Sequence, residues 1–308
     1  MDTEHIANIT AEHAKRLLAE DSLIPPPTSW AGAGGTLLGT EHAVALATRS
    51  EISPTAAEAL WRPLVEHRLD VRLAGSDPGA RLGELLDAWE PHVRECPRGE
   101  WDTAAIVVRP SRDTAGTEEL IRRGFAPGRV IAVRPADRLG GGPPAVPGVR
   151  IRRAEWRDRP TAVRLLLELL RYDAQFGLVT PRDAAERVVT EQVDRELAQR
   201  EPQLWIAELY GEPLGIAQLQ LPPASDWVRG QVSAGRVGYL TSLNVAEQAR
   251  STGVGTALAE HAHQVFDEAG AEVVLLHHAL ASPRSTPFWY AQGYRPLWTY
   301  WYRRPAVR

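Results

Sequence analysis

Cysteine, long apolar runs and blocks of like charge are all scarce in this sequence of 308 residues. Its single cysteine, Cys96, cannot form an internal disulfide, and a zinc cluster or a CxxC redox motif needs further cysteines. No stretch approaches the roughly 18 consecutive apolar residues of a membrane span. The acidic, polar start (MDTEHIANIT) has no apolar core typical of a secretory signal. We therefore expect a cytoplasmic protein with no membrane partner and no metal.

A strong charge of one sign is also missing. The 35 basic residues nearly balance the 39 acidic ones, for a formal net charge of -4 and a pI near 6.2. A dedicated nucleic-acid binder usually carries a concentrated basic face, so we expect no nucleic-acid partner. Apolar residues make up 44% of the chain and charged residues 24%, which suits a packed core. At roughly 150 residues per domain, the length predicts two domains.

The clearest break in composition is the run Gly-Gly-Gly-Pro-Pro-Ala-Val-Pro-Gly at residues 140–148. Its glycines are conformationally free and its prolines lack a donor, so the run suits neither a helix nor a central strand. We interpret it as part of an inter-domain linker at 139–148, with domains at 1–138 and 149–308. A surface loop inside one domain is the alternative.

The residues after this run alternate between strand-like and helix-like patterns. Strands are predicted at 149–152, 204–209, 214–221, 236–245, 273–278 and 297–303. Helices are predicted through Leu165 to Tyr172, at 181–200 with Thr180 as cap, up to Ala269 before Gly270, and at 286–292.

The first half repeats the end of this order less clearly. Its pattern predicts a helix at 82–93, a strand at 104–108, a short helix at 118–123, the pair Gly124-Phe125 and a strand at 130–133. The pair Gly124-Phe125 parallels Gly293-Tyr294 in the second half. We interpret the repeated order as a degenerate internal duplication. Two unrelated α/β pieces are the alternative.

The segment from Tyr239 to Leu258 carries the most informative chemistry. A strand runs into a loop, and Gly253 and Gly255 follow at the mouth of a helix. The first amides of a helix have no internal partners and the macrodipole adds positive charge there, while glycine lets a ligand approach the backbone. Arg250 adds a full positive charge. The segment therefore predicts an anion site suited to a pyrophosphate.

Two common phosphate motifs do not fit this loop. No Gly-Lys-Ser/Thr follows, as a Walker A loop requires, and the loop lacks the third glycine of a dinucleotide fingerprint. The hexamer Arg250-Ser-Thr-Gly-Val-Gly255 follows Leu243-Asn-Val245 and precedes a helix, a strand and Gly293-Tyr294. In this order it resembles the GNAT superfamily of N-acetyltransferases. The resemblance covers residues 149–303 well and the first half weakly, at 104–133.

The resemblance implies an α/β (α+β) fold of two tandem GNAT-like domains, the first degenerate, each a mixed, mostly antiparallel sheet flanked by helices. It implies acetyl-CoA as co-substrate, with its pyrophosphate on the amides of Arg250, Ser251, Thr252, Gly253, Val254, Gly255 and Thr256. Backbone groups of Leu243, Asn244 and Val245 would pair with the pantetheine arm, and an amide near Leu243 would receive the thioester oxygen. Ser282 stands where the family often has an asparagine that contacts CoA. Because no such loop precedes residues 82–93, we expect one cofactor site.

Acetyl transfer to an amine needs a base and an acid. The family usually places a tyrosine acid four residues before the glycine of the Gly-aromatic pair, where this chain has Trp289, so Tyr290 becomes the candidate acid. His277 and His278 end a strand and face opposite sides, so we expect at most one in the cleft, and His278 is the candidate base. Asp173 would favour a cationic acceptor if it faced the pocket, but a surface position is the simpler expectation.

These observations predict an acetyl-CoA-dependent N-acetyltransferase that moves an acetyl group to the amine of a small molecule. Direct attack in a ternary complex is expected, because Cys96 is far from the motif and is a poor candidate for a covalent nucleophile. The alternative is a CoA-binding sensor or scaffold without turnover, which Trp289 and Ser282 motivate. A thiol-cofactor biosynthetic enzyme would differ only in its acceptor.

Overall fold

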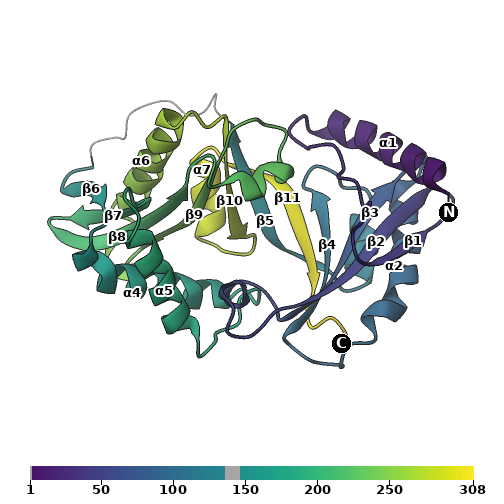
Figure 1. Cartoon of the computed structure of the whole chain (residues 1–308), viewed down its shortest axis with the longest axis horizontal. Coiled ribbons are helices and arrows are strands. Elements are labelled where there is room, and N and C mark those ends of the chain that lie inside the picture. The colour runs from purple at the N-terminus through teal and green to yellow at the C-terminus, as the bar shows by residue number, and fades with distance from the viewer. Residues whose placement is uncertain (1, 136–145) are drawn as a thin grey trace.

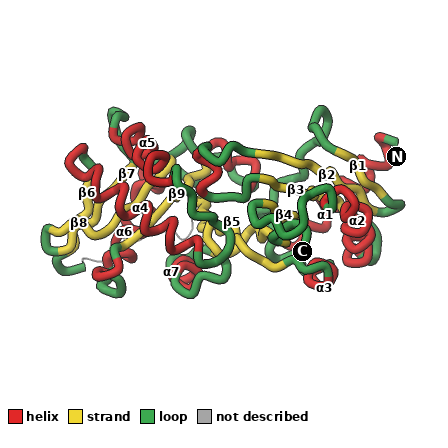
Figure 2. Tube along the Cα trace, turned by 90° about the horizontal axis from the view of Figure 1, so that it is seen from below, coloured by secondary structure: helices red, strands yellow, loops and turns green. Residues whose placement is uncertain are grey.

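The computed structural model describes residues 2–135 and 146–308. Residues 139–145 of the predicted linker lie outside the described residues, so the linker and the domain boundary stay predictions. The described chain forms one sheet in the order β1-β2-β3-β4-β11-β5-β10-β9-β8-β7-β6, which runs the length of an elongated molecule (Figures 1 and 2).

The strands are β1 (Thr36–Gly39), β2 (Ala43–Glu51), β3 (Val65–Leu73), β4 (Thr103–Pro110), β5 (Ala126–Pro135), β6 (Val149–Arg153), β7 (Leu204–Leu209), β8 (Glu212–Gln220), β9 (Val237–Val245), β10 (Val273–Ala279) and β11 (Arg295–Arg303). The helices are α1 (Thr3–Glu20), α2 (Pro78–Val93), α3 (Thr117–Arg122), α4 (Arg159–Ala174), α5 (Ala185–Leu197), α6 (Val254–Glu268) and α7 (Ser285–Ala291). No helix in the described ranges is both long and apolar enough to cross a membrane.

Two sets of strands with the same pairing pattern make up the sheet. In the first half β1, β2 and β3 pair antiparallel and β3 pairs parallel with β4. In the second half β7, β8 and β9 pair antiparallel and β9 pairs parallel with β10. Helices α2 and α6 connect the two parallel pairs, and α3 and α7 follow them. The prediction of a mixed, mostly antiparallel sheet flanked by helices in each half is confirmed.

The two halves exchange their last strands. Strand β11, the last of the chain, lies between β4 and β5, and β5 lies between β11 and β10. All three contacts are antiparallel. The sheet is therefore continuous across the molecule, and each half is completed by a strand of the other (Figure 1).

Helices α4 and α6 cover opposite faces of the sheet near the end of β9. The side-chain amide of Asn244 donates a hydrogen bond to the Leu165 carbonyl of α4 over 2.8 Å. The neighbouring Val245 instead lies under the start of α6, beside Gly255. Consecutive strand residues point to opposite faces, so these two contacts place the helices on either side.

The first half also reaches into the core of the second. A short 3₁₀ helix, η1 (Ala57–Leu60), places Leu60 in the apolar cluster formed by α4, α5, β7 and β8. Arg182 anchors this contact, because its guanidinium donates to the Ala59 carbonyl over 2.7 Å and forms an ion pair with Asp102 at 2.8 Å. The two halves therefore share buried apolar and charged contacts as well as strands.

The helix predicted at 181–200 begins later than expected. Helix α5 starts at Ala185, and Pro181 lies in the preceding loop. Thr180 does not cap the helix, because its hydroxyl accepts a hydrogen bond from the Arg304 guanidinium. A tertiary contact between chain positions more than 120 residues apart replaces the local cap.

Candidate functional site

The sheet opens between β9 and β10. Their parallel pairing ends at Tyr239 and Leu275, although β9 continues to Val245 and β10 to Ala279. A register shift against β8 leaves Thr241 as an extra residue in β9, which bends a strand at this kind of position. Beyond the shift, backbone groups of β9 on the β10 side have no strand partner within the described residues. They are available to an extended ligand.

A cavity of about 670 Å³ occupies this opening, and we call it the central cleft. Five consecutive residues of β9, from Tyr239 to Leu243, line it. Since neighbouring strand residues point to opposite faces, the cleft passes through the sheet. Its volume is in the range of pockets that hold drug-sized ligands.

The loop before α6 presents backbone amides. Ser251 and Gly253 both have positive φ, of 64° and 91°, so the chain turns sharply ahead of the helix. No side chain caps α6, and the described residues supply no acceptor for the amides from Ser251 to Thr256. Such a turn followed by a helix N-terminus forms an anion-binding concavity.

The other loop residues have distinct local roles. Arg250 donates from Nε to the Val245 carbonyl over 3.2 Å, and its guanidinium lies 5.9 Å from the centre of the Tyr172 ring. Thr252 donates its hydroxyl to the Ala249 carbonyl over 2.6 Å, and the Val254 side chain is fully buried. The carbonyl contact holds the Arg250 guanidinium at the base of the loop.

Gly255 is not required by the protein's own backbone. Its φ is not positive, and an added Cβ would only meet Phe288 and Val245 at an ordinary 3.6 Å. Gly253 differs, because its φ of 91° would strain any other residue. The bare backbone at both positions fits a pyrophosphate that approaches the loop closely.

Ser282 and Asn244 already have partners. The Ser282 hydroxyl accepts from the Ser285 amide over 3.0 Å at the start of α7, and it lies 3.2 Å from the Tyr172 hydroxyl. Asn244 is bonded to α4, as described above. Both predicted contacts to CoA stay predictions, and both side chains also hold the walls of the site together.

In the first half, side chains accept hydrogen bonds from the backbone amides that correspond to the unpartnered amides before α6. At the end of β3 the Leu73 amide donates to His13 Nδ1 over 3.2 Å, and the Gly75 amide donates to Glu12 over 2.8 Å. Asp77 caps α2 by accepting from the Ala80 amide over 2.9 Å. Two carboxylates and an imidazole therefore fill the counterpart of the loop before α6, and a diphosphate would meet like charge there.

Both histidines of β10 line the central cleft. The expectation that at most one of them faces it is wrong, because the cleft crosses the sheet and meets both faces of β10. His277 Nδ1 lies 2.9 Å from the Tyr239 hydroxyl, and burial with nearby arginines lowers the pKa of His277 to about 3. Burial raises the pKa of Tyr239, so its hydroxyl is the donor in this pair.

His278 keeps one buried ring nitrogen without a partner in the described residues. Its Nδ1 lies 3.1 Å from the Ala279 carbonyl, which fixes the proton on that nitrogen. Nε2 is buried and has no partner among the described residues, so its lone pair is unused. Burial lowers the pKa of His278, which keeps the ring neutral at pH 7.

Tyr290 lies next to the cleft without lining it. Its ring packs edge-on against His278 with centroids 5.9 Å apart, and it is 39% exposed. Burial raises the pKa of its hydroxyl. Trp289, one residue earlier on α7, does line the cleft. The assignment of Tyr290 as acid stays a prediction.

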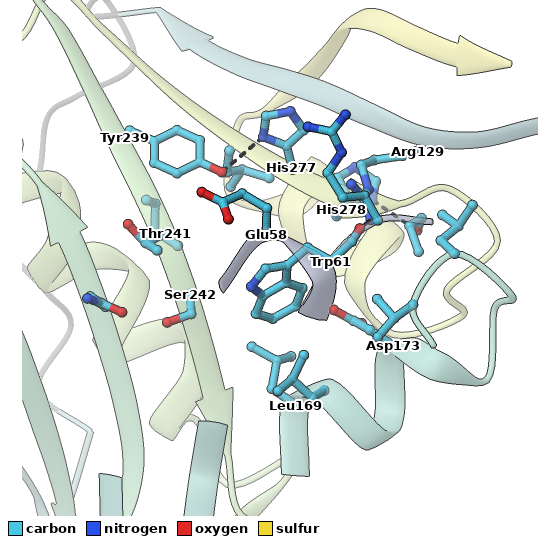
Figure 3. Close-up of a pocket in the computed structure, with 18 of the residues that line it drawn as sticks. Glu58, Trp61, Arg129, Leu169, Asp173, Tyr239, Thr241, Ser242, His277 and His278 are labelled. Atoms are coloured by element: carbon cyan, nitrogen blue, oxygen red, sulfur yellow. Dashed lines mark hydrogen bonds between the residues drawn. The ribbon is translucent and has the colours of Figure 1, made fainter. Parts of the chain in front are cut away.

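The far end of the cleft is built from both halves (Figure 3). Asp173, at the end of α4, faces the cleft, so the expected surface position is wrong. Burial raises the pKa of its carboxyl to about 6. Glu58 and Trp61 enter from η1 and the residue after it, and Arg129 enters from β5. Sequence reasoning missed these three residues, because no local motif marks them. In the described ranges, no group of three or more His, Cys, Asp or Glu side chains could hold a metal ion.

Comparisons with known proteins agree with this geometry. Residues 166–294 match the profile of the Acetyltransferase (GNAT) family. A GCN5-related N-acetyltransferase from Sphaerobacter thermophilus superposes with a TM-score of 0.60 at 15% identity, over 99% of this chain and 95% of that chain. A glucosamine N-acetyltransferase region of a fungal multi-domain GH3 β-N-acetylglucosaminidase gives 0.51 at 13% identity, over 85% and 31%.

A tandem GNAT protein from the clavulanic acid biosynthesis pathway gives a TM-score of 0.49 at 14% identity, over 100% of this chain and 96% of that chain. No curated protein matches this chain. At 15% identity and below, the likeness to the Sphaerobacter and fungal structures is one of fold.

Proposed function

We propose that this chain transfers an acetyl group from acetyl-CoA to the amine of a small molecule, because residues 166–294 match the profile of the Acetyltransferase (GNAT) family. The observation that carries the proposal is the pairing of an opened β9–β10 edge with unpartnered amides at the start of α6. Acetyl-CoA supplies an activated thioester. The amine attacks it directly in a ternary complex.

Residues of the second half hold the co-substrate. The amides from Ser251 to Thr256 bind the pyrophosphate, and the guanidinium of Arg250 adds charge at the same place. The expected contact of the Arg250 amide is replaced by a hydrogen bond to the Glu247 carbonyl over 3.3 Å. The free backbone groups of Leu243 and the amide of Val245 pair with the pantetheine arm as an added strand would. The Val245 carbonyl is already bonded to Arg250. An amide near Leu243 then points at the thioester oxygen, where negative charge develops during attack.

Proton transfer falls to residues at the centre of the cleft. An amine with a pKa near 10.4 arrives protonated, so one proton must leave before attack. The unused Nε2 of His278 accepts it. After the carbon–sulfur bond breaks, Tyr290 donates a proton to the thiolate. Tyr290 is 39% exposed, so solvent can return the proton. The products are an acetamide and free CoA thiol.

Calorimetry with CoA and a free-thiol assay with a panel of amines test the proposal. One CoA should bind per chain, since the first half fills its own loop with Asp77, Glu12 and His13. Thiol release should saturate with one class of amine. The His278→Gln variant should keep its CoA affinity and lose roughly a hundredfold or more in kcat. His42→Gln, at a partly exposed histidine of the first half, is the control.

Two results would count against this assignment. Wild-type turnover by His278→Gln across the pH range would remove His278 from the mechanism. Tight CoA binding without thiol release from any amine would favour the second candidate, a CoA-binding sensor or scaffold. That candidate is favoured by one observation, the indole of Trp289 in the cleft where the family places an acidic hydroxyl.

A further inference from the structure

Two opposite charges at the far end of the central cleft lack partners. Arg129 and Asp173 both line the cleft, and within the described residues neither belongs to an ion pair. The Arg129 guanidinium donates one hydrogen bond, to the Trp61 carbonyl over 2.7 Å. A guanidinium has five N–H donors, so most remain available. The Asp173 carboxylate accepts no hydrogen bond from the side chains and amides of the described ranges.

The other charged groups around the cleft are compensated or exposed. Arg62 bonds to Glu66 over 3.0 Å, and Glu196 accepts from the Gln203 amide over 2.6 Å. Glu58, which also enters the far end of the cleft, is exposed to solvent. Arg68 also lines the cleft, and its guanidinium lies over the Tyr300 ring. Arg129 and Asp173 are the oppositely charged pair at the far end of the cleft that a ligand can complete.

The two groups lie near each other without touching. Arg129 lowers the pKa of Asp173 against the larger effect of burial, yet the pair is not within ion-pair distance. Arg129 also lowers the pKa of His277 at the centre of the cleft. A molecule with one positive and one negative group suits this arrangement, because it completes both charges at once.

We propose that the acceptor is an amine that also carries a carboxylate, such as an amino acid, with its ammonium group at Asp173 and its carboxylate on Arg129. This inference rests on the proposed function, because it names the acceptor of the same reaction. A guanidinium matches a carboxylate bidentately, which gives direction as well as charge. Asp173 receives the amine before attack and holds it on the cleft side of α4.

Other amine classes fit these residues less well. A polyamine would bring a second positive charge toward Arg129 and toward Arg68, which lies over the Tyr300 ring at 5.7 Å. A simple alkylamine would leave Arg129 desolvated without a counter-ion, which is costly. The first half thus supplies the groups that select an acceptor with a carboxylate, since Arg68 and Arg129 both belong to its strands.

Pairs of acceptors that differ only in their carboxylate group test the inference. The twenty L-amino acids are compared as acceptors with their C-terminal amides, at fixed acetyl-CoA, by thiol release. The preferred free acid should exceed its amide by roughly ten- to a hundredfold in kcat/KM, the range of a hydrogen bond to a charged group. Phosphonate analogues of the same amino acids distinguish a carboxylate from a phosphate-like group.

Variants assign the preference to Arg129. Arg129→Gln should lower kcat/KM for the acid by tenfold or more, and leave that of the amide within about twofold. Arg164→Gln, on the partly exposed side of α4, is the matched control. CoA affinity measured by calorimetry reports whether each variant remains folded.

The outcomes separate the inference from the proposed function. Equal kcat/KM for acids and amides, or a preference for amides or phosphonates, overturns the inference and leaves acetyl transfer intact. Equal losses for acid and amide in Arg129→Gln overturn the role of Arg129. Binding of CoA with no turnover of any amine, amides and alkylamines included, overturns the proposed function and this inference with it.

Discussion

At the scale of single residues, burial controls the charge of the cleft. A low-dielectric environment disfavours charged forms, so histidines become less basic and carboxyls less acidic. His277 is neutral at pH 7 for this reason and accepts from Tyr239. Asp173, whose pKa is about 6, is mostly ionised at pH 7 although no partner stabilises it. Such a group costs stability and marks a functional position.

Because the buried Asp173 carboxylate destabilises the folded state, Asp173→Asn should raise the free energy of unfolding by an amount that depends on pH. The carboxyl titrates near 3.8 when unfolded and near 6 when folded, so the folded state holds more protons between these values. The free energy of unfolding of the natural protein therefore falls as pH rises from about 4 to 6. Asp173→Asn should be more stable by up to about 3 kcal/mol at pH 7, and equally stable near pH 4. Its kcat/KM for the acceptor should fall.

Urea unfolding from pH 4 to 8 measures this difference. Buried histidines such as His13, with a pKa near 3, lose stability as pH falls, but they contribute equally to both proteins and cancel. Asp183→Asn, at an exposed position, is the control. Parallel stability curves for the natural protein and Asp173→Asn would show that Asp173 is not destabilised by burial.

At the scale of elements, α2 and α6 occupy matching places and differ in how they begin. Asp77 caps α2 with its own carboxylate, while α6 begins at a glycine with no side-chain cap. Helix α2 therefore has a side-chain partner for one of its first amides. Helix α6 leaves its first amides without a side-chain partner, and it lacks the stability that a cap usually adds.

Adding a carboxylate to the α6 loop should imitate the first half. Ser251 is exposed and has a φ of 64°, which Asn and Asp tolerate better than most residues. Ser251→Asp should weaken CoA binding by roughly tenfold or more through repulsion at about 5 Å, and this loss should shrink in high salt. Ser251→Asn has the same shape without the charge and should bind normally.

Calorimetry at two ionic strengths measures the effect, and thermal unfolding checks the fold of both variants. Equal affinities for Ser251→Asp and Ser251→Asn would mean that this loop does not face the CoA phosphates.

At the scale of the whole molecule, the exchanged strands make each half depend on the other. Without β5, strand β11 would lose one neighbour and β10 would become an edge. Unpaired strand edges in a sheet favour aggregation. The exchange also carries Arg129 into the cleft of the second half, because Arg129 belongs to β5.

Separating the chain should therefore abolish folding of the halves as monomers. Residues 146–308 expressed alone should be insoluble, or folded only as a dimer that pairs its exposed β10 and β11. Co-expression with residues 1–138 should restore a soluble complex that binds CoA. Size-exclusion chromatography and circular dichroism measure both outcomes. A folded, CoA-binding monomer of 146–308 would show that the second half is self-sufficient.

The sequence by itself determined the elements of the second half and predicted an anion-binding loop between two of them. Strand and helix periodicity placed β7 and β10 within a residue of their observed bounds, and Arg250 to Gly255 was recognised from its own spacing. Both signals are local, because backbone geometry and helix termini depend on neighbouring residues. The same local reasoning missed α1, β1, β2 and β3, whose patterns are weaker.

Only the tertiary structure decided what surrounds the loop. The exchange of β5 and β11, the arrival of Trp61 and Arg129 beside Asp173, and the filling of the first half's loop by Glu12 and His13 join residues far apart in the chain. Spacing along a chain does not encode such contacts, since they arise when apolar faces and unpaired strand edges are buried together. The glycine loop ahead of α6 could therefore be predicted from the sequence, and the residues at the far end of the cleft could not.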